Sequence, residues 1–448
     1  MKKLPFAISL ILLLICASSF SVRVAEEKAK EFTVNGLKVI LKPSIKEIIS
    51  ARFFIKGGTA NYTKEQEGIE ALTLSVAVGG GTKKMNKTEF ATALEKIGTT
   101  ISYSTTYDYS EINMSCIKEF WDPSWKLFAD VITEPRFELK EFDLIKAQAI
   151  SQAKQTETNP DAHLRNRGME SAFKGHNYAK IPNGTSTSLE KLSVEHITNH
   201  YKSIIGKQNC FLVIVGNVSE ADLKARITSA FASLAEGKKL VPEKRLELNA
   251  TSTIENRDIP TNYIRGIMAA PSVSEKDGVP MMLAMAIMRD RFFVELRTKR
   301  SLTYAPSASY TSTIFNNPYA IFYASSTDPK QTLNVMMDQI NEVKNQGFKD
   351  KELKDMKESY LTDHFLGLET NDSQTMALGQ AEVAGDWRMT ETFMNQVEKT
   401  SIQDINNVFK KYATSINWMY LGKEGSISPE DFKQPQLLPA AEKVSPKK

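Results

Sequence analysis

The pattern of apolar and polar positions predicts short strands and helices that alternate along the chain. Asn35-Gly36 separates two short apolar runs and is typical of a tight hairpin turn. In the first half we expect, in order, a hairpin over 31–43, a strand over 49–56, helices over 68–78 and 87–97, a hairpin formed by 99–106 and 109–117, a helix over 124–133, a helix-rich segment over 137–175, a helix over 194–204 and a strand over 209–215.

The second half of the chain repeats this order. Three pairs of similar segments begin at Phe137 and Phe348, which are 211 positions apart, at Ser193 and Ser401, which are 208 apart, and at Asp122 and Asp328, which are 206 apart. Matching landmarks at nearly one offset indicate a duplicated structural unit rather than chance similarity.

Hairpins mixed with helices in each repeat predict an α+β fold. We expect two duplicated domains, each a largely antiparallel sheet with helices packed on it, arranged as a clamshell around a cavity. The polar stretch 235–258 is the natural linker. The predicted division is a first domain over 31–235, a linker over 236–258, a second domain over 259–430 and a disordered tail over 431–448 that is rich in proline and lysine.

The N-terminus predicts export. Lys2 and Lys3 precede an apolar run over 6–16, and small residues follow it, which is the pattern of a secretory signal peptide over 1–21. The periplasm is therefore the expected location. Lipoprotein anchoring through Cys16 is the less favoured alternative, because Ile15 is bulky where a small residue is needed. No stretch is long and apolar enough to predict a transmembrane helix.

Charge and cysteine content argue against two kinds of binding site. The net charge of +4 in 448 residues comes without a basic tract, so nucleic-acid binding is not expected. Cys116 and Cys210 lie in strand-like runs without a CxxC neighbour, so a thiolate metal site is not expected either. Either the two cysteines pair or each is a buried packing residue.

The segment 290–310 carries candidate chemistry. Its apolar residues are helix-periodic up to Leu296, Ser301 marks a turn, and residues 302–310 alternate like a strand. Arg297 and Tyr304 therefore flank a helix-to-strand corner, where a planar cation and a phenol hydroxyl would together hold a carbonyl oxygen or a carboxylate. Alternatively, Arg297 caps a helix C-terminus and Tyr304 is a packing residue at the start of a strand.

Four segments resemble the insulinase-type (M16) metallopeptidases, in their short bacterial and mitochondrial-processing-peptidase-like branch. They read VNGLKVIL, FFIKGGTANYTKEQEGIEALTLSVAVGGGTKK, QTETNPD and FVELRTKRSLTYAPSAS. The resemblance implies two like α+β domains, dimers that enclose a proteolytic chamber, and an Arg and a Tyr seven positions apart in the second domain. Those two residues match Arg297 and Tyr304.

The chain departs from this family at its zinc motif, H-x-x-E-H. Aligned with that motif, Ala71 and Ser75 replace the two histidines and Leu74 replaces the general base, while the later carboxylate ligand falls at Ser151 or Gln152. Alanine and leucine neither bind zinc nor move a proton. We therefore expect no metal site at these positions.

Other candidate groups are weaker. Only His196 and His200, among the five histidines, have the i, i+4 spacing of metal ligands, but no third ligand is apparent and the repeated helix in the second half has no histidine. Glu157 lies one turn beyond the lost ligand position and is expected to be a solvated or capping carboxylate. Lys299 and Arg300 are expected to bind acidic neighbours or shape the local field.

The resemblance leads to two functional hypotheses. The preferred one is a non-catalytic subunit of a two-chain exported M16 peptidase, in which a zinc-bearing H-x-x-E-H partner supplies the metal and Arg297 and Tyr304 grip an unfolded or short peptide. The alternative is a zinc-less scaffold or peptide-binding protein with no role in catalysis. An autonomous zinc peptidase is the least favoured reading.

Overall fold

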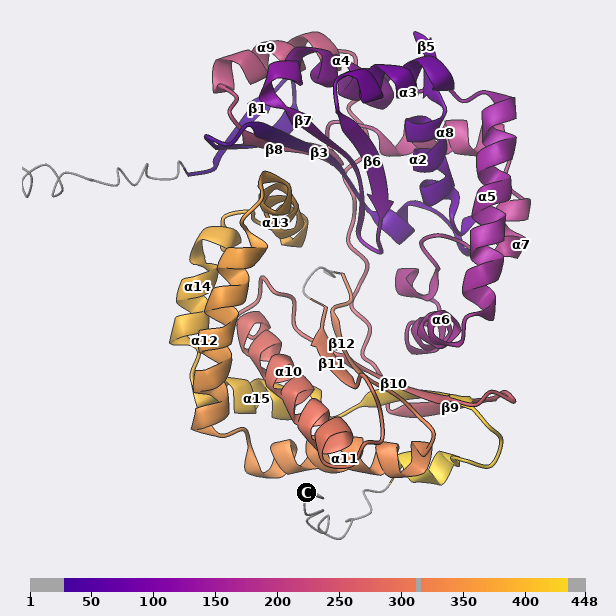
Figure 1. Ribbon diagram of the computed structural model, residues 1–448, viewed down its shortest axis with the longest axis vertical. Coiled ribbons are helices and arrows are strands. Elements are labelled where there is room, and N and C mark those ends of the chain that lie inside the picture. Colours follow the sequence, from indigo (N-terminus) through magenta and orange to yellow (C-terminus); the bar gives the residue numbers. More distant parts are fainter. Residues whose placement is uncertain (1–27, 312–315, 434–448) are drawn as a thin grey trace, which may run out of the picture.

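The computed structural model describes residues 28–311 and 316–433 (Figure 1). The predicted signal peptide over 1–21, with Cys16, lies outside the described residues, as does 434–448 of the predicted tail. Within the described ranges, we find no helix with the length and apolarity needed to cross a bilayer.

The first half forms a six-stranded sheet with the order β1-β2-β8-β3-β7-β6. Its strands are β1 (Lys30–Val34), β2 (Leu37–Pro43), β3 (Ile48–Lys56), β6 (Thr100–Thr105), β7 (Tyr109–Ile117) and β8 (Cys210–Gly216), and a separate small ribbon joins β4 (Gly81–Thr82) and β5 (Met85–Asn86). Its helices are α2 (Ile69–Gly79), α3 (Lys87–Lys96), α4 (Trp121–Thr133), α5 (Leu139–Thr158), α6 (Pro160–Ala172), α7 (Ser186–Glu190), α8 (Val194–Ile204) and α9 (Glu220–Phe231).

The second half forms a five-stranded sheet with the order β11-β12-β10-β13-β9. Its strands are β9 (Thr251–Asn256), β10 (Asn262–Ala269), β11 (Ser307–Tyr310), β12 (Tyr319–Ser326) and β13 (Ile416–Gly422). Its helices are α10 (Gly278–Phe292), which continues into a π-helical turn (Phe293–Thr298), α11 (Pro329–Gln346), α12 (Asp350–Gly367), α13 (Asn371–Ala384), α14 (Met389–Lys399) and α15 (Ile402–Tyr412).

The two sheets have the same topology. The order β2-β8-β3-β7-β6 in the first corresponds to β9-β13-β10-β12-β11 in the second, and each contains one parallel pair, β2 with β8 and β13 with β9. The other pairs are antiparallel, which confirms the duplicated α+β fold with largely antiparallel sheets. The Asn35-Gly36 turn is also confirmed, because both residues have the positive φ (50° and 88°) of a tight hairpin.

Two sequence-based expectations need correction. The segment 236–258 is not linker throughout, because Thr251–Asn256 forms β9 and pairs with β13; residues 234–250 form neither helix nor strand. The expected strand over 302–310 is only Ser307–Tyr310, because Ser301 has φ 51° and Pro306 offers no backbone N–H for a ladder.

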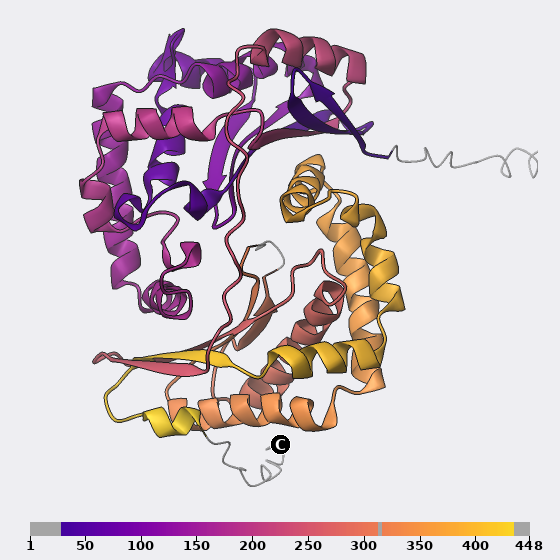
Figure 2. The same ribbon diagram turned by 180° about the vertical axis from the view of Figure 1, so that it is seen from behind.

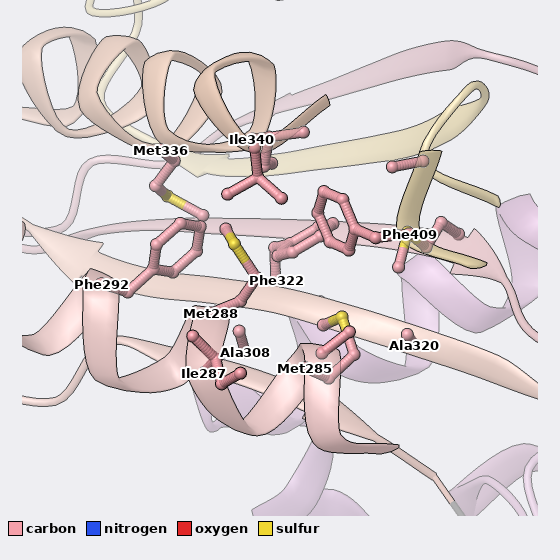
Figure 3. Packing of buried hydrophobic residues seen from close by; sticks show 14 of the residues in the cluster. Met285, Ile287, Met288, Phe292, Ala308, Ala320, Phe322, Met336, Ile340 and Phe409 are labelled. Atoms are coloured by element: carbon pink, nitrogen blue, oxygen red, sulfur yellow. The ribbon is translucent and has the colours of Figure 1, made fainter. Parts of the chain in front are cut away.

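Each half has its own apolar core on one face of its sheet. In the second half, α10 packs its methionines and Phe292 against Phe322 of β12 and Ile340 of α11 (Figure 3). Phe292, Phe322 and Met288 are fully buried. Burying side chains of this size contributes about 1.5–3 kcal/mol each relative to exposure, so these cores supply the main driving force for folding.

The other face of each sheet is covered by a helix from the opposite half. Helix α13 of the second half lies on β3 and β8, and α6 of the first half lies on β10 and β13 (Figures 1 and 2). These helices occupy corresponding places in the duplication, at an offset of 211 between Pro160 and Asn371. The halves therefore interlock, and both faces of each sheet are covered.

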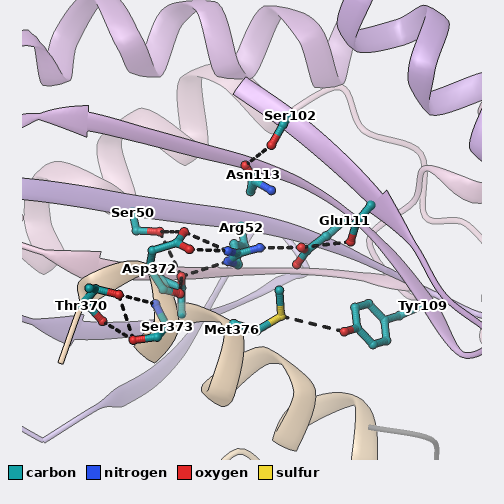
Figure 4. Close-up of polar contacts among 12 residues, drawn as sticks. Ser50, Arg52, Ser102, Tyr109, Glu111, Asn113, Thr370, Asp372, Ser373 and Met376 are labelled. Carbon is teal, nitrogen blue, oxygen red and sulfur yellow. Dashed lines mark hydrogen bonds and ion pairs between the residues drawn. The ribbon is translucent and has the colours of Figure 1, made fainter. Parts of the chain in front are cut away.

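A polar cluster around the buried Arg52 fixes α13 to the first sheet (Figure 4). Arg52 of β3 donates from Nη2 to both carboxylate oxygens of Asp372, at 2.8 and 2.9 Å, and from Nε to Thr375 at 3.1 Å. Its Nη1 donates to Glu111 of β7. Arg52 is only 5% exposed, so these partners compensate the desolvation of its charge.

The two cysteines are both buried and free. On β3, Ile49 pairs with Cys116 of β7 and Ile55 pairs with Cys210 of β8. Six residues of extended strand separate these positions by roughly 20 Å, whereas a disulfide needs Cα atoms within about 7 Å. Of the two alternatives, buried packing is therefore correct.

Candidate functional site

The positions aligned with the lost zinc motif border a cavity of about 830 Å³. Ala71 and Ser75 of α2 line it together with Gln152 of α5, whereas Ser151 does not. Leu74 points elsewhere, since it is fully buried in the core of the first half. Of the two aligned positions on α5, Gln152 is thus the one that borders the cavity beside Ala71 and Ser75.

The side chains at these positions do not fit zinc. Ala71 has a methyl group, Leu74 an isobutyl group, Ser75 a hydroxyl and Gln152 a neutral amide. None of these groups is an imidazole or a carboxylate, the ligands that hold the ion in this family's motif. Across the residues that the structure describes, no group of three or more His, Cys, Asp or Glu side chains is placed to bind a metal.

His196 and His200 have structural partners instead. The Nδ1 atom of His196 accepts a hydrogen bond from the backbone N–H of Ser193, at 3.1 Å, in a helix-capping box. His200 is buried and lies 3.2 Å from a carboxylate oxygen of Glu70. Two histidines with separate local partners are elements of the fold, as the sequence comparison of the repeats indicated.

Glu157 is a capping residue, as predicted. Its carboxylate accepts hydrogen bonds from the backbone N–H of Ser186, at 2.7 Å, and from the Ser186 hydroxyl, at 3.0 Å. Ser186 is the first residue of α7, so a negative charge there complements the helix N-terminus. The same carboxylate borders the cavity near Ala71.

Arg297 and Tyr304 are in direct contact. The guanidinium carbon of Arg297 lies 4.5 Å from the centre of the Tyr304 ring and 4.9 Å from that of Phe293. Arg297 lies in the π-helical turn after α10, and Tyr304 lies in the irregular segment before β11. Tyr304 is 79% exposed, and neither residue lines the two cavities described in this section.

The two basic neighbours of Arg297 bind one carboxylate. Lys299 Nζ lies 2.6 Å from Glu295, and Arg300 Nη1 donates to the carboxylate of Glu295 at 2.7 Å and to its backbone oxygen at 2.9 Å. Burial alone would raise the pKa of Glu295, but the bonds from Lys299 and Arg300 outweigh it and lower that pKa. Lys299 and Arg300 therefore bind an acidic neighbour, as expected.

A second cavity, of about 620 Å³, lies between the halves. Arg165 of α6 and Arg265 of β10 line it, together with residues of α5, β11 and β12. It shares Gln152, Thr156 and Arg165 with the larger cavity. Sequence reasoning missed both arginines, although the correspondence of Arg265 with Arg52 in the duplicated strands is a signal that points to one of them.

Comparison with known proteins agrees with these observations. Residues 38–186 match the family described as insulinase (peptidase family M16), and residues 191–360 match the peptidase M16 inactive domain. An uncharacterized zinc protease of Rickettsia felis is 25% identical over 308 residues, which cover 67% of this chain and 73% of that protein.

A second relative and a solved structure extend the match. The non-peptidase homolog YmxG of Helicobacter pylori is 21% identical over 373 residues, which cover 81% of this chain and 85% of that protein. The crystal structure of a peptidase M16 inactive domain from Pseudomonas fluorescens superposes with a TM-score of 0.83 at 18% identity, covering 90% of this chain and 100% of that one. The chain therefore belongs to the insulinase-type M16 peptidase family, with the zinc-less form of its fold.

Proposed function

We propose that this chain is the non-catalytic subunit of a two-chain, exported M16 peptidase, and that it contributes Arg297 and Tyr304 to substrates held against a zinc-bearing partner. The observation that carries the proposal is the loss of the zinc-motif residues together with the retention of the Arg–Tyr pair. Ala71, Leu74 and Ser75 occupy the metal-motif positions, while the Arg297–Tyr304 pair is intact and in contact. A chain that lacks the metal ligands but retains the pair is suited to assist another subunit.

The chemistry of the pair fits this role. Zinc held by the partner would supply an activated water for peptide hydrolysis. Arg297 is permanently charged and its side chain makes no hydrogen bond or salt bridge to other described residues, so its donors are available to a substrate. The exposed Tyr304 hydroxyl is a second donor. Together they would hold the peptide backbone or stabilise an oxyanion, an interaction worth up to about 3–4 kcal/mol per donor.

The expected substrate is an unfolded or short peptide. Two cavities are lined by residues from both halves, since Arg165 and Arg265 meet in one, and Ala71 and Tyr319 in the other. Enclosure by interlocked halves favours extended chains over folded proteins. The predicted signal peptide over 1–21 supports export to the periplasm, with lipoprotein anchoring through Cys16 as the less favoured form.

The test is reconstitution. The chain and an H-x-x-E-H family member from the same organism are purified separately, and cleavage of a quenched fluorescent peptide is measured for each and for the mixture. We expect a stable complex, peptide cleavage by the mixture well above that of either chain, and no stoichiometric zinc in this chain by metal analysis. One tightly held zinc in this chain, or full activity of the partner alone, contradicts the proposal.

A scaffold or peptide-binding role is the second candidate. It is favoured by the absence of Arg297 and Tyr304 from the lining of the two cavities, which leaves them as a surface pair. In that case the mixture would form a complex without any gain in cleavage, and substitution of either residue would have no effect on turnover.

A further inference from the structure

Arg52 and Arg265 occupy the same place in the two sheets. Arg52 lies on β3 opposite Asn113 of β7, and Arg265 lies on β10 opposite Tyr323 of β12. Both face the helix donated by the other half, and both are buried, at 5% and 9% exposure. Comparing the side chains around Arg52 and Arg265 therefore shows which group each half places beside its arginine.

Arg52 is bound by two carboxylates of the chain itself. Asp372 on α13 engages one edge of the guanidinium, and Glu111 on β7 engages the other. Glu111 also accepts a hydrogen bond from the hydroxyl of Ser104 on β6, at 3.2 Å. An arginine and a serine hydroxyl from an adjacent strand thus form a carboxylate site, which Glu111 fills.

Around Arg265 these partners are only partly matched, because Thr375, which accepts from Nε of Arg52, corresponds at the same offset of 211 to the apolar Leu164. Asp161 of α6 corresponds to Asp372, and burial together with the nearby charge of Asp161 raises the pKa of the Tyr323 phenol. The position of Glu111, however, is taken by Ile321: Phe54 pairs with Glu111 in the first sheet, and Ile267 pairs with Ile321 in the second. The second half keeps the arginine and has lost the carboxylate.

Among the described residues, the guanidinium of Arg265 consequently has no hydrogen-bond or salt-bridge partner. Its Nε atom is buried without any hydrogen bond, and its side chain makes no hydrogen bond or salt bridge with other residues in 28–311 or 316–433. Burial is the main cause that lowers the pKa of Arg265. An arginine this deeply buried remains charged at neutral pH, so an anion that reaches it gains a strong, charge-assisted hydrogen bond.

The place that corresponds to Glu111 opens into the cavity of about 620 Å³. Arg265 and Ile321 line it, as does Ser309, which pairs with Ile321 as Ser104 pairs with Glu111. Arg165 adds a second positive charge, and Asp161 is the one acidic side chain among the described residues of the lining. The cavity therefore has a positive balance and is much larger than a carboxylate.

We propose that this cavity binds a carboxylate of a peptide, with Arg265, Arg165 and the Ser309 hydroxyl as its donors, in the position that Glu111 fills in the first half. The carboxylate is either the C-terminus of the peptide or an Asp or Glu side chain. The proposal concerns this chain by itself and holds whether or not a zinc-bearing partner exists.

The strand beside the cavity favours a peptide over a small anion. Strand β11 is at the end of the sheet order, and its outer edge pairs with no other strand of the described residues. Its backbone N–H and C=O groups are thus able to bind an extended peptide, the usual mode of strand addition. Ser307 and Ser309 of this strand line the cavity, so a peptide paired with β11 would bring its carboxylate to Arg265.

The experiment is calorimetry on the purified full chain without partner. Four probes are compared: acetylated tetra-alanine with a free carboxyl terminus, its C-terminal amide, a doubly blocked peptide with one central glutamate, and inorganic phosphate. We expect one of the two carboxylate peptides to bind, and the amide to bind at least tenfold more weakly. The free terminus and the glutamate peptide distinguish the two sources of the carboxylate.

Substitutions then test the donors. Arg165→Gln is exposed and Arg265→Gln is buried, and each is expected to weaken binding at least tenfold. Arg167→Gln, on the same helix, is the control, because Arg167 pairs with Glu170 outside the cavity and its loss is expected to leave binding unchanged. If Arg265→Gln fails to fold, Arg165→Gln and the variant described next still decide the question.

The variant Ile321→Glu tests the proposed carboxylate position most directly. It restores the carboxylate that the first half has, so its side chain is expected to pair with Arg265 and Ser309, to abolish peptide binding and to leave the melting temperature equal to or above that of the wild type. Ile321→Gln, the neutral match, is expected to lower the melting temperature. Binding of the amide as tightly as both carboxylate peptides, binding of phosphate alone, no binding by the wild type, or unchanged binding in Ile321→Glu overturns the proposal.

Discussion

Gly168 and Gly379 lie 211 positions apart and mark the same point in the two halves, where a helix of one half crosses the sheet of the other. At Gly379 a Cβ atom would lie 2.0 Å from Cζ of Phe54, whose ring is fully buried and stacked on Phe211. At Gly168 a Cβ would be 3.4 Å from Arg265 Cδ, an ordinary contact. Only the crossing at Gly379 leaves no room for an additional methyl group.

Alanine at the two glycines is therefore expected to have opposite effects. Gly379→Ala should destabilise the chain by about 1–3 kcal/mol, because overpacking against a fixed ring outweighs the gain in helix propensity. Gly168→Ala should be neutral or stabilising by up to about 1 kcal/mol, because alanine favours the helix. Chemical denaturation of both variants measures the difference.

The double variant Phe54→Leu/Gly379→Ala provides the control. Leucine removes the ring atoms that meet the new methyl group, so the double variant should be less destabilised than the sum of its two single variants. Strict additivity would mean that Phe54 is not the obstacle.

Arg297 and Tyr304 are expected to matter in the reconstituted complex and not for folding. Arg297→Ala should lower kcat of the mixture roughly ten- to hundredfold, and Tyr304→Phe roughly tenfold, since each removes one donor from the substrate. Arg297→Lys keeps the charge without the planar fork and should be intermediate. Lys299→Ala, which removes only a contact to Glu295, is the matched control. Full turnover in Arg297→Ala and Tyr304→Phe would assign the pair to surface packing.

Glu295 should contribute to acid sensitivity. Its pKa in the folded chain is lowered below the ordinary value of 4.5 despite burial, because Lys299 and Arg300 bond the charged form. A lowered pKa means that the unfolded chain binds the proton more readily, so the contribution of Glu295 to stability is present above pH 4.5 and is lost as the pH falls through the folded pKa. Melting temperatures from pH 7 to pH 3 should therefore fall less steeply for Glu295→Gln than for the wild type. Parallel curves would show that the carboxylate is not linked to folding.

The cysteines should be inert in the native chain. Burial raises the pKa of Cys116 and raises that of Cys210 to about 12, and a thiol rather than a thiolate reacts slowly. We expect neither thiol to react with a disulfide reagent under native conditions, and both to react after denaturation. Intact mass should show no loss of two protons between them under oxidising conditions. A Cys116–Cys210 disulfide in the folded chain would contradict the register of β3 with its neighbours.

The sequence indicated the fold well where the pattern is local. The Asn35-Gly36 turn was predictable because few residue pairs accept positive φ, and the duplication was predictable because matching segments recur at nearly one offset. Strand β9 was placed in the linker because TSTIEN is a mostly polar, half-exposed edge strand without apolar alternation. Its membership of the sheet depends on β13, whose paired residues lie 166 positions further along the chain.

The site was predictable in part. Ala71, Leu74 and Ser75 are informative because their chemistry excludes zinc in any fold, and the contact of Arg297 with Tyr304 follows from their places around one corner. Arg265 was missed, because one arginine within an apolar strand gives no periodic signal and only its correspondence with Arg52 points to it. Only the register of β10 with β12, and the helix that the other half lays across them, bring Arg265 beside Ile321.

The packing of α6 and α13 on the sheet of the opposite half bears on the origin of the duplication. Two identical chains that each packed one helix on the sheet of the other would form a twofold-symmetric, domain-swapped dimer. In this chain residues 234–250 join the two units covalently. Covalent fusion frees the copies from having to be alike. The two copies now differ: Arg52 is bound by Asp372 and Glu111 of the chain itself, whereas Arg265 faces an open cavity.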